Sequence, residues 1–252
     1  MYPEPVERVD PDPRSPWWGE HRSRYRYAAQ HVRDRVVLDL ACGSGYGCFI
    51  LANADARLVI GMDIALESAE DRGRSFALCT ADAAKIPLQD HSIDVITSFE
   101  TIEHVEDDQA FVSELRRVIT PGGRLFLSTP NGSLSPKMDG RPANPFHVRE
   151  YEPVHLERLL GEQFAAVHLL GQKTKPYYRV SPFWDHPDVI PRDAATRRRV
   201  LLWKAQNRLP FALKEGLSRM LHDRSFFPGE MDWDFSDQHV RTAHALVAVC
   251  EP

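Results

Sequence analysis

Residues 36–47 have the sequence Val36-Val37-Leu38-Asp39-Leu40-Ala41-Cys42-Gly43-Ser44-Gly45-Tyr46-Gly47, and they form the most informative stretch of this chain. An apolar run that ends in glycines is typical of a central parallel strand followed by a tight turn. Glycine lets the backbone turn sharply and approach a ligand closely. We therefore expect an α/β fold with a ligand-binding turn after its first strand.

A second apolar run, Leu58 to Met62, ends at Asp63, twenty positions after Gly43. A carboxylate at the tip of a second strand is well placed to accept hydrogen bonds from the two hydroxyls of a ribose. The first half of the chain is therefore predicted to hold an adenosine.

The spacing of the glycines distinguishes two kinds of adenosine cofactor. Dinucleotide-binding turns carry G-x-G-x-x-G, and the helix start receives a pyrophosphate. Here the spacing is G-x-G-x-G, and Asp39 lies just before the turn. Its charge would repel a pyrophosphate but could attract an amino group. The pattern resembles motif I of the class I S-adenosylmethionine-dependent methyltransferases.

Further segments follow in the order that this family has. They match its third strand, its fourth strand, and its helix, Pro-Gly-Gly turn and fifth strand, respectively Thr80-Ala81-Asp82-Ala83, Ile93 to Glu100 and Leu115 to Leu127. The resemblance covers about residues 20–172 and the last strand. It implies a Rossmann-like, seven-stranded, mostly parallel sheet with helices on both faces and a helical insertion between the last two strands.

The resemblance also assigns residues to S-adenosylmethionine. In the family, the glycine-rich loop holds the methionine part, the acid after the second strand holds the ribose, and an acid after the third strand lies near the adenine. A helix before the first strand packs across the cofactor mouth. The residues assigned in this way are Asp39, Ala41, Gly43, Gly45, Gly47, Asp63, Ile64, Asp82, Ala83, Phe99 and Tyr25.

Composition favours a cytoplasmic enzyme. With 252 residues, 42% of them hydrophobic, the chain can bury one full α/β core. Its formal charge of −5 offers no general attraction for nucleic acid. The N-terminus lacks the apolar core of a signal peptide, and no apolar run approaches membrane-spanning length. We expect a small-molecule substrate and no nucleic acid, and we leave a homo-oligomer open.

The chain is predicted to have a core interrupted by one insertion. The parts are an arm with a cap helix (1–35), the core (36–172 and 244–252) and the insertion (173–243). The arm starts Pro-rich, and the insertion has helix candidates at Asp193 to Arg208 and Phe211 to Arg224. The insertion leaves the sheet at the edge where such folds bind ligands. We expect the arm and the insertion to form a substrate lid; a dimer contact or a packed helical cap is the alternative.

The segment after the fourth strand, Glu100-Thr101-Ile102-Glu103-His104, carries the expected chemistry. An alcohol that attacks a methyl group benefits from a base or a metal. Histidine has an ordinary pKa of about 6.5, which suits a base at neutral pH. We expect catalytic roles for His104, Glu100 and His147; a structural or cofactor-side role is the alternative.

A divalent metal is a sharper form of the same hypothesis. Glu100, Glu103 and His104 occupy positions i, i+3 and i+4, so a helical turn would cluster them, and His147 follows the fifth strand. Two carboxylates and two imidazoles could hold a divalent ion. The arrangement resembles the metal site of small-RNA 2′-O-methyltransferases, whose basic RNA-binding surfaces this chain does not show. The metal is left open.

The segments Ser128 to Gly132 and Asn144 to Tyr151 resemble those of bacterial methyltransferases that modify sugars, glycan chains and antibiotics. His147, Arg149 and Tyr151 offer hydrogen-bond donors suited to a hydroxylated acceptor. We therefore predict methyl transfer to an oxygen or nitrogen of a sugar, glycoside or antibiotic-type metabolite. The alternatives are an RNA 2′-O-methyltransferase with a Glu/His metal site and a non-catalytic partner protein that binds S-adenosylmethionine.

Overall fold

The computed structural model describes residues 12, 14–66, 76–135, 137–175, 178, 194, 197–198, 201, 204–205 and 208–252. The Pro-rich start of the predicted arm and most of the predicted helix Asp193 to Arg208 lie outside these residues. The chain divides into two compact units. The first comprises Met1–Val9, Arg24–Lys173 and Phe235–Pro252, and the second comprises Asp10–Ser23 and Thr174–Asp234.

Strands and helices alternate along the first part of the chain. They are α1 (Pro16–Ala29), β1 (Val36–Leu40), α2 (Tyr46–Ala52), β2 (Leu58–Asp63), β3 (Ala77–Thr80), β4 (Ile93–Phe99), η1 (Ile102–His104), α3 (Asp108–Val118) and β5 (Ile119–Pro130). The later elements are β6 (Lys137–Met138), β7 (Arg141–Pro142), α4 (Pro153–Gly161), β8 (Ala166–Thr174), α6 (Phe211–His222), β9 (Trp233–Ser236), η3 (Asp237–His239) and β10 (Ala245–Glu251).

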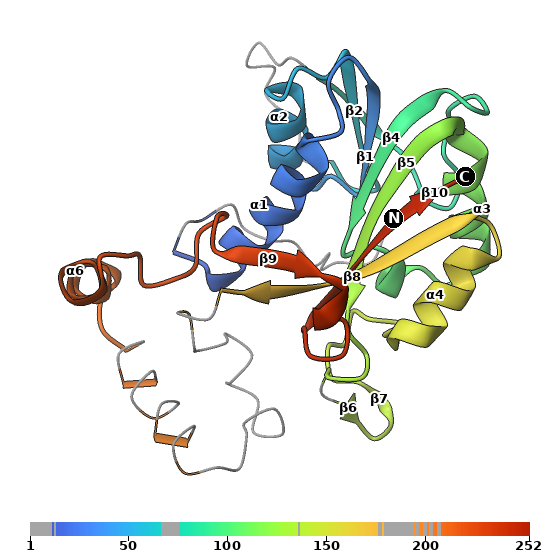
Figure 1. The fold of residues 1–252 in the computed structure, drawn as a ribbon. Coiled ribbons are helices and arrows are strands. Elements are labelled where there is room, and N and C mark those ends of the chain that lie inside the picture. The colour runs from blue at the N-terminus through green and yellow to red at the C-terminus, as the bar shows by residue number, and fades with distance from the viewer. Residues whose placement is uncertain are drawn as a thin grey trace. The chain divides into compact units, whose positions relative to one another are not determined.

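One sheet dominates the fold (Figure 1), and its strand order is β3-β2-β1-β4-β5-β10-β8-β9. The strands from β3 to β5 run parallel, and β10 runs antiparallel to both β5 and β8. The predicted Rossmann-like, mostly parallel sheet is therefore confirmed. It has eight strands instead of seven because Trp233–Ser236, which the prediction placed in the insertion, forms the edge strand β9. This segment alternates aromatic and polar residues, as strands with one buried face do.

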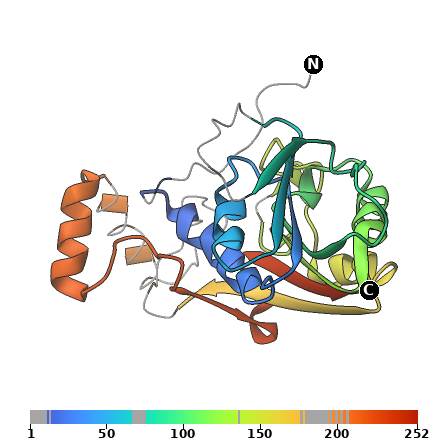
Figure 2. The same cartoon turned by 90° about the horizontal axis from the view of Figure 1, so that it is seen from above.

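Helices cover both faces of the sheet, as predicted. In both views α2 lies on the same face as α1, and α3 and α4 lie on the other (Figures 1 and 2). The α3–α4 face contains Phe111, Leu115 and Leu156 in one fully buried cluster. The opposite cluster contains Ala28 and Leu51. Because each face of the sheet is buried under helices, the strand ends are left to position polar groups.

The strand register brings several polar residues to one edge of the sheet. Asp39 lies opposite Thr97 of β4, and Asp63 lies opposite Thr80 at the end of β3. β4 ends at Phe99, so Glu100 follows at the same edge. This is the carboxyl edge of the parallel strands, where open α/β sheets bind their ligands.

The second unit joins part of the predicted arm to part of the predicted insertion. A Cβ atom added to Gly19 would lie only 2.1 Å from the carbonyl oxygen of Pro228, so α1 packs directly on that backbone. Arg22 forms an ion pair with Glu230. Helix α6 confirms the second helix candidate of the insertion. No described helix is long and apolar enough to cross a membrane.

Candidate functional site

The loop after β1 has the backbone that its glycines predict. Ala41, Gly43 and Gly45 have φ angles of 60°, 54° and 78°, in the left-handed region that glycine adopts readily. A Cβ atom on Gly43 would meet no atom of the described residues within 4 Å, so the loop is open on that side. A Cβ atom on Gly47 would lie 2.1 Å from the ring of Tyr25, so only glycine fits there. The loop can therefore receive a ligand against its own backbone.

Asp63 fastens this loop to the tip of β2. Its Oδ2 accepts the N–H of Gly43 at 2.8 Å, and its Oδ1 accepts the N–H of Ala65 at 2.9 Å. A carboxylate has about four acceptor positions, so it can hold the loop and still accept ribose hydroxyls. The structure thus orients the Asp63 side chain, which is 9% exposed, in the place where the ribose-binding acid was predicted.

Asp39 is a fully buried acid at the end of β1. Its carboxylate accepts hydrogen bonds from the hydroxyls of Tyr25 (3.1 Å) and Thr97 (2.8 Å) and from the thiol of Cys48 (3.3 Å). Burial raises the pKa of Asp39 to about 6, although these three hydrogen bonds act in the opposite direction. A cationic ligand at this edge would favour its ionised form.

The remaining residues assigned to the cofactor lie close to the same edge. Ile64 directly follows β2 and is half-buried, as is Ala83. Asp82 is exposed two residues after β3, and its side chain accepts the N–H of Ala84 at 2.9 Å. Phe99 ends β4, and its ring meets that of Tyr25 edge-on, with 4.9 Å between centroids.

Glu100 lies beside a buried cation that the sequence did not single out. Arg24 of α1 is 2% exposed; its Nη1 lies 2.9 Å from Glu100 Oε1, and its Nε donates to the Gln172 side chain at 2.6 Å. The same Glu100 oxygen accepts the hydroxyl of Ser128 at 2.8 Å. Glu100 also has a φ of 51°, which is uncommon for a residue with a side chain. Its Oε1 is therefore engaged by both Arg24 and Ser128.

Glu103 is the buried acid of this region, at 0% exposure. Its Oε2 accepts the hydroxyl of Thr129 at 3.0 Å, and no described residue donates a hydrogen bond to its Oε1. Burial raises the pKa of Glu103 well above its usual range, and the charge of nearby Glu100 adds to the shift.

Two histidines meet next to Glu103. His104 ends η1, and its Nδ1 lies 3.0 Å from the carbonyl oxygen of Phe146. The rings of His104 and His147 meet edge-on, with centroids 4.9 Å apart. The Nδ1 of His147 lies 2.9 Å from Glu150 Oε1. A carboxylate oxygen of Glu103 and a ring nitrogen of each histidine all lie within 4.8 Å of one another.

Two of the three side chains that were predicted to donate hydrogen bonds to the methyl acceptor bind another protein side chain instead. Tyr151 donates its hydroxyl to Asp108 at 2.8 Å, and Arg149 forms an ion pair with the same carboxylate at 2.8 Å. Both contacts join the segment after β7 to the start of α3. Of the three predicted donors, only His147 lies in the histidine cluster.

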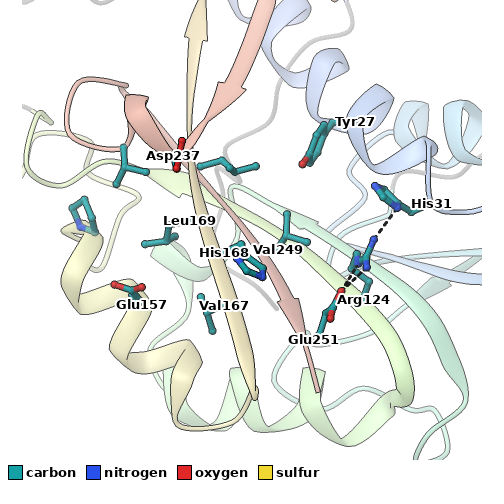
Figure 3. Close-up of a pocket in the computed structure, with 13 residues that line it drawn as sticks. Tyr27, His31, Arg124, Glu157, Val167, His168, Leu169, Asp237, Val249 and Glu251 are labelled. Atoms are coloured by element: carbon teal, nitrogen blue, oxygen red, sulfur yellow. Dashed lines mark hydrogen bonds and ion pairs between the residues drawn. The ribbon is translucent and has the colours of Figure 1, made fainter.

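A surface pocket of about 780 Å³ is lined from α1, β5, α4, β8, η3 and β10 (Figure 3). None of the predicted cofactor-binding or catalytic residues lines it. Its Arg124 pairs with Glu251 and lies 2.9 Å from His31, so these polar groups satisfy one another. We assign it no role in the chemistry.

Sequence reasoning missed Arg24, Thr97 and Glu150. Arg24 is one of three arginines at alternating positions, 22, 24 and 26, and nothing in that pattern distinguishes it. Thr97 lies on an apolar strand, where a hydroxyl usually has only a structural partner. Glu150 lies three residues after His147, a spacing that could have indicated its contact with that ring.

Comparison with known proteins identifies the domain. Residues 38–127 match the family described as a methyltransferase domain. The chain is 39% identical over 148 residues to a probable S-adenosylmethionine-dependent methyltransferase of Mycolicibacterium smegmatis, and the match covers 57% of each chain. It is 29% identical over 154 residues to the 27-O-demethylrifamycin SV methyltransferase of Amycolatopsis mediterranei, covering 53% of this chain and 56% of that one. The chain thus spans little more than half the length of these relatives.

The fold has close counterparts among solved structures. An S-adenosylmethionine-dependent methyltransferase from Archaeoglobus fulgidus superimposes with a TM-score of 0.59 over 94% of this chain and 95% of the other, at 17% identity. That likeness concerns the fold alone. Residues 38–127 are thus similar in sequence to a methyltransferase domain, and the sheet that contains them has the fold of a solved S-adenosylmethionine-dependent methyltransferase.

Proposed function

We propose that this class I methyltransferase domain belongs to an active enzyme that methylates an oxygen or nitrogen of a small hydroxylated molecule, such as a sugar, glycoside or antibiotic-type metabolite. The observation that carries the proposal is the placement of two groups at one sheet edge. Asp63, at the end of β2, is oriented by two backbone N–H groups, and His104, after β4, meets His147 from the segment after β7. The relative that acts on a rifamycin supports a small-molecule acceptor.

The residues around the β1 loop suit S-adenosylmethionine. Asp63 would hold the ribose, the open side of Gly43 would receive the methionine part, and buried Asp39 would attract its ammonium group. When bound, the cofactor supplies the methyl group. The left-handed turn at Gly43 and Gly45 and the close packing of Gly47 on Tyr25 preorganise this loop before any ligand arrives.

His104 is the base in this proposal. The carbonyl oxygen of Phe146 can only accept a hydrogen bond, so the Nδ1 of His104 carries the proton in their contact. In the neutral ring the Nε2 then has the lone pair and can take a proton from an acceptor hydroxyl. An amine acceptor that is already neutral would not need this base.

A methyl-transfer assay tests the proposed activity. The purified chain is incubated with S-adenosylmethionine and a panel of glycosides, free sugars and macrocyclic antibiotics, and methylated products are detected by mass spectrometry. We expect methylation of at least one hydroxylated compound and calorimetric binding of S-adenosylmethionine but not of NAD. Cofactor binding without transfer to any compound, small RNAs included, would favour a non-catalytic binding protein.

We also propose that the arm and the insertion move together as a substrate lid. What supports this is that a part of each, Asp10–Ser23 and Thr174–Asp234, belongs to one compact unit, in which Gly19 packs on Pro228 and Arg22 pairs with Glu230. Within the same unit, the Lys214 ammonium lies 4.7 Å from the centre of the Phe227 ring. A lid would exclude water from the reaction and open for exchange.

Hydrogen exchange tests the lid. Addition of S-adenosylhomocysteine and an acceptor should raise protection in residues 15–30 and 173–240 together. Gly19→Ala should uncouple the two segments, because its side chain would displace the Pro228 carbonyl. Gly216→Ala is the matched control, since a Cβ atom there meets no described atom within 4 Å. Protection that depends only on protein concentration would instead indicate a dimer contact.

A further inference from the structure

One side of helix α6, which we call its outer face, exposes a row of large apolar side chains. The residues of this face are between 42% and 73% exposed, and they are Leu213, Leu217, Met220 and Leu221. Their spacing of i, i+4, i+7 and i+8 places them on one side of the helix, because an α-helix repeats every 3.6 residues. A single exposed leucine is ordinary, but a contiguous apolar row on one helix face indicates an interaction surface.

The opposite side of α6 is fixed to its own compact unit. Lys214 is 9% exposed, and its ammonium lies 4.9 Å and 4.7 Å from the centres of the Phe226 and Phe227 rings. The carboxylate of Glu215 accepts the N–H of Phe226 at 2.8 Å and pairs with Arg219 at 2.7 Å. These contacts set the rotation of the helix, so the outer face is turned away from the segment that holds it.

The segment that contains α6 is strongly basic within an acidic chain. Residues 192–224 have nine Lys and Arg against three Asp and Glu, which is a formal charge of +6, whereas the whole chain has a formal charge of −5. Among the described residues of this segment, Arg208 and Arg219 are exposed. A charge asymmetry of this size favours an anionic partner that meets this segment.

An anionic lipid surface is the partner that uses both features. Nucleic acid would attract the basic residues but would leave the aliphatic row in water. A second copy bound through the same face would bring two basic segments together, because a two-fold contact pairs each patch with itself. Protein partners are mostly anchored by Trp, Tyr and Arg, whereas Leu is under-represented among such anchors. Basic helices with a leucine-rich face are instead typical of membrane surfaces.

We propose that the outer face of α6 binds to the surface of a membrane that contains anionic phospholipids. Its apolar side chains enter the boundary between headgroups and acyl chains, and the lipid phosphates attract the basic segment. With 12 residues, α6 lies in the plane of this surface, because about 20 apolar residues are needed to cross the hydrocarbon core. The attachment is therefore peripheral, reversible and sensitive to salt.

Vesicle binding by the whole chain tests this proposal. The protein is mixed with vesicles of phosphatidylcholine, with or without phosphatidylglycerol, and the bound fraction is measured by flotation. We expect binding to the anionic vesicles and about tenfold weaker binding, or less, to phosphatidylcholine alone. Raising the salt concentration should release the protein from the anionic vesicles, because salt screens the charges.

Two pairs of variants separate the apolar contribution from the electrostatic one. Met220→Glu places a charge on the outer face and should weaken binding to anionic vesicles by about tenfold or more. Met138→Glu is the matched control, since Met138 is 63% exposed on β6 of the first unit. Arg208→Gln should weaken binding by about 2- to 5-fold. Arg33→Gln, at an exposed ion pair of the first unit, should not weaken it. All four positions are exposed, so circular dichroism should show folded variants.

Several outcomes would overturn the proposal. No binding of the wild type to anionic vesicles, or equal binding by the wild type and Met220→Glu, would refute it directly. Self-association that Met220→Glu abolishes, without vesicle binding, would assign the outer face to a second copy. Capture by poly-glutamate without vesicle binding would assign it to an acidic protein. Loss of methyl transfer in Met220→Glu with unchanged vesicle binding would assign it to the proposed lid.

Discussion

The proposed cofactor side and the proposed catalytic side of this sheet edge are held by different kinds of contact. On the cofactor side, Asp63 accepts backbone N–H groups from its own strand end and from the adjacent loop. On the catalytic side, Glu100, Glu103 and His104 depend on Arg24, Thr129 and Phe146, which lie 26 to 76 positions away. The first arrangement forms as soon as two neighbouring strands pair. The second requires that several distant segments pack correctly.

The largest expected effect is a loss of cofactor affinity when the cofactor side is disrupted. Asp63→Ala removes two hydrogen bonds from ribose to a charged acceptor and releases the Gly43 loop. Binding of S-adenosylmethionine should weaken by about 30- to 1000-fold. Isothermal calorimetry measures this, with Asp55→Ala, at an exposed ion pair, as the control. Unchanged affinity would show that Asp63 neither binds the ribose nor holds a loop that the cofactor needs.

The next effect concerns the catalytic side alone. His104→Ala should lower turnover by about 100-fold while affinity for S-adenosylmethionine barely changes, because the base acts in the chemical step. Steady-state kinetics with an identified acceptor would separate the two quantities. Equal turnover of the variant and the wild type would leave catalysis to proximity, as expected for an amine acceptor.

A smaller effect, on the free energy of unfolding, is expected when the ion pair between Arg24 and Glu100 is removed. Arg24→Met keeps an apolar stem but leaves Glu100 without its cation. Because Glu100 keeps some access to water, we expect the free energy of unfolding to fall by about 1–3 kcal/mol. Urea denaturation would show it. Arg26→Met, two positions along on the exposed side of α1, should change the free energy by less than about 0.5 kcal/mol.

The smallest expected effect is the pH dependence of stability and of cofactor binding that Asp39 causes on the cofactor side. The pKa of Asp39 is about 6 in the fold, above its ordinary value of 3.8. Its contribution to stability is therefore fully present below about pH 4 and is lost as the pH rises through 6. Binding of the cationic cofactor needs the ionised acid and should weaken about tenfold between pH 7 and pH 5. Thermal melts and calorimetry across this range should move in opposite directions, and parallel changes would exclude Asp39 as their source.

The features that depend on a local sequence pattern could be predicted from the sequence alone. The glycine turn, the position of Asp63 and the α/β alternation follow from apolar runs and glycine spacing, and the structure has them in place. The helical clustering of Glu100 with Glu103 and His104 was only partly right, because η1 covers Ile102–His104 and Arg24 engages Glu100. An ion pair between residues 76 positions apart leaves no local pattern in the sequence.

The edge strand β9 was missed for a related reason. Its four residues carry a strand-like alternation, but a short segment forms a strand only if a neighbouring edge is available, and that depends on the whole sheet. The catalytic and cofactor roles of individual residues, the lid, the cytoplasmic location and any homo-oligomer remain predictions.

The contact between Cys48 and Asp39 allows the opening of the loop after β1 to be followed by chemical labelling of Cys48. Cys48 is fully buried, and its thiol donates to Asp39 at 3.3 Å. A hydrogen bond with Cys42 and burial raise the pKa of the Cys48 thiol far above its usual range. Only a thiolate attacks an alkylating reagent, so Cys48 reacts only while α2 and its loop are open. Half-buried Cys79 should be modified first. The rate at which Cys48 is alkylated after Cys79, measured by mass spectrometry, then reports how often the loop opens.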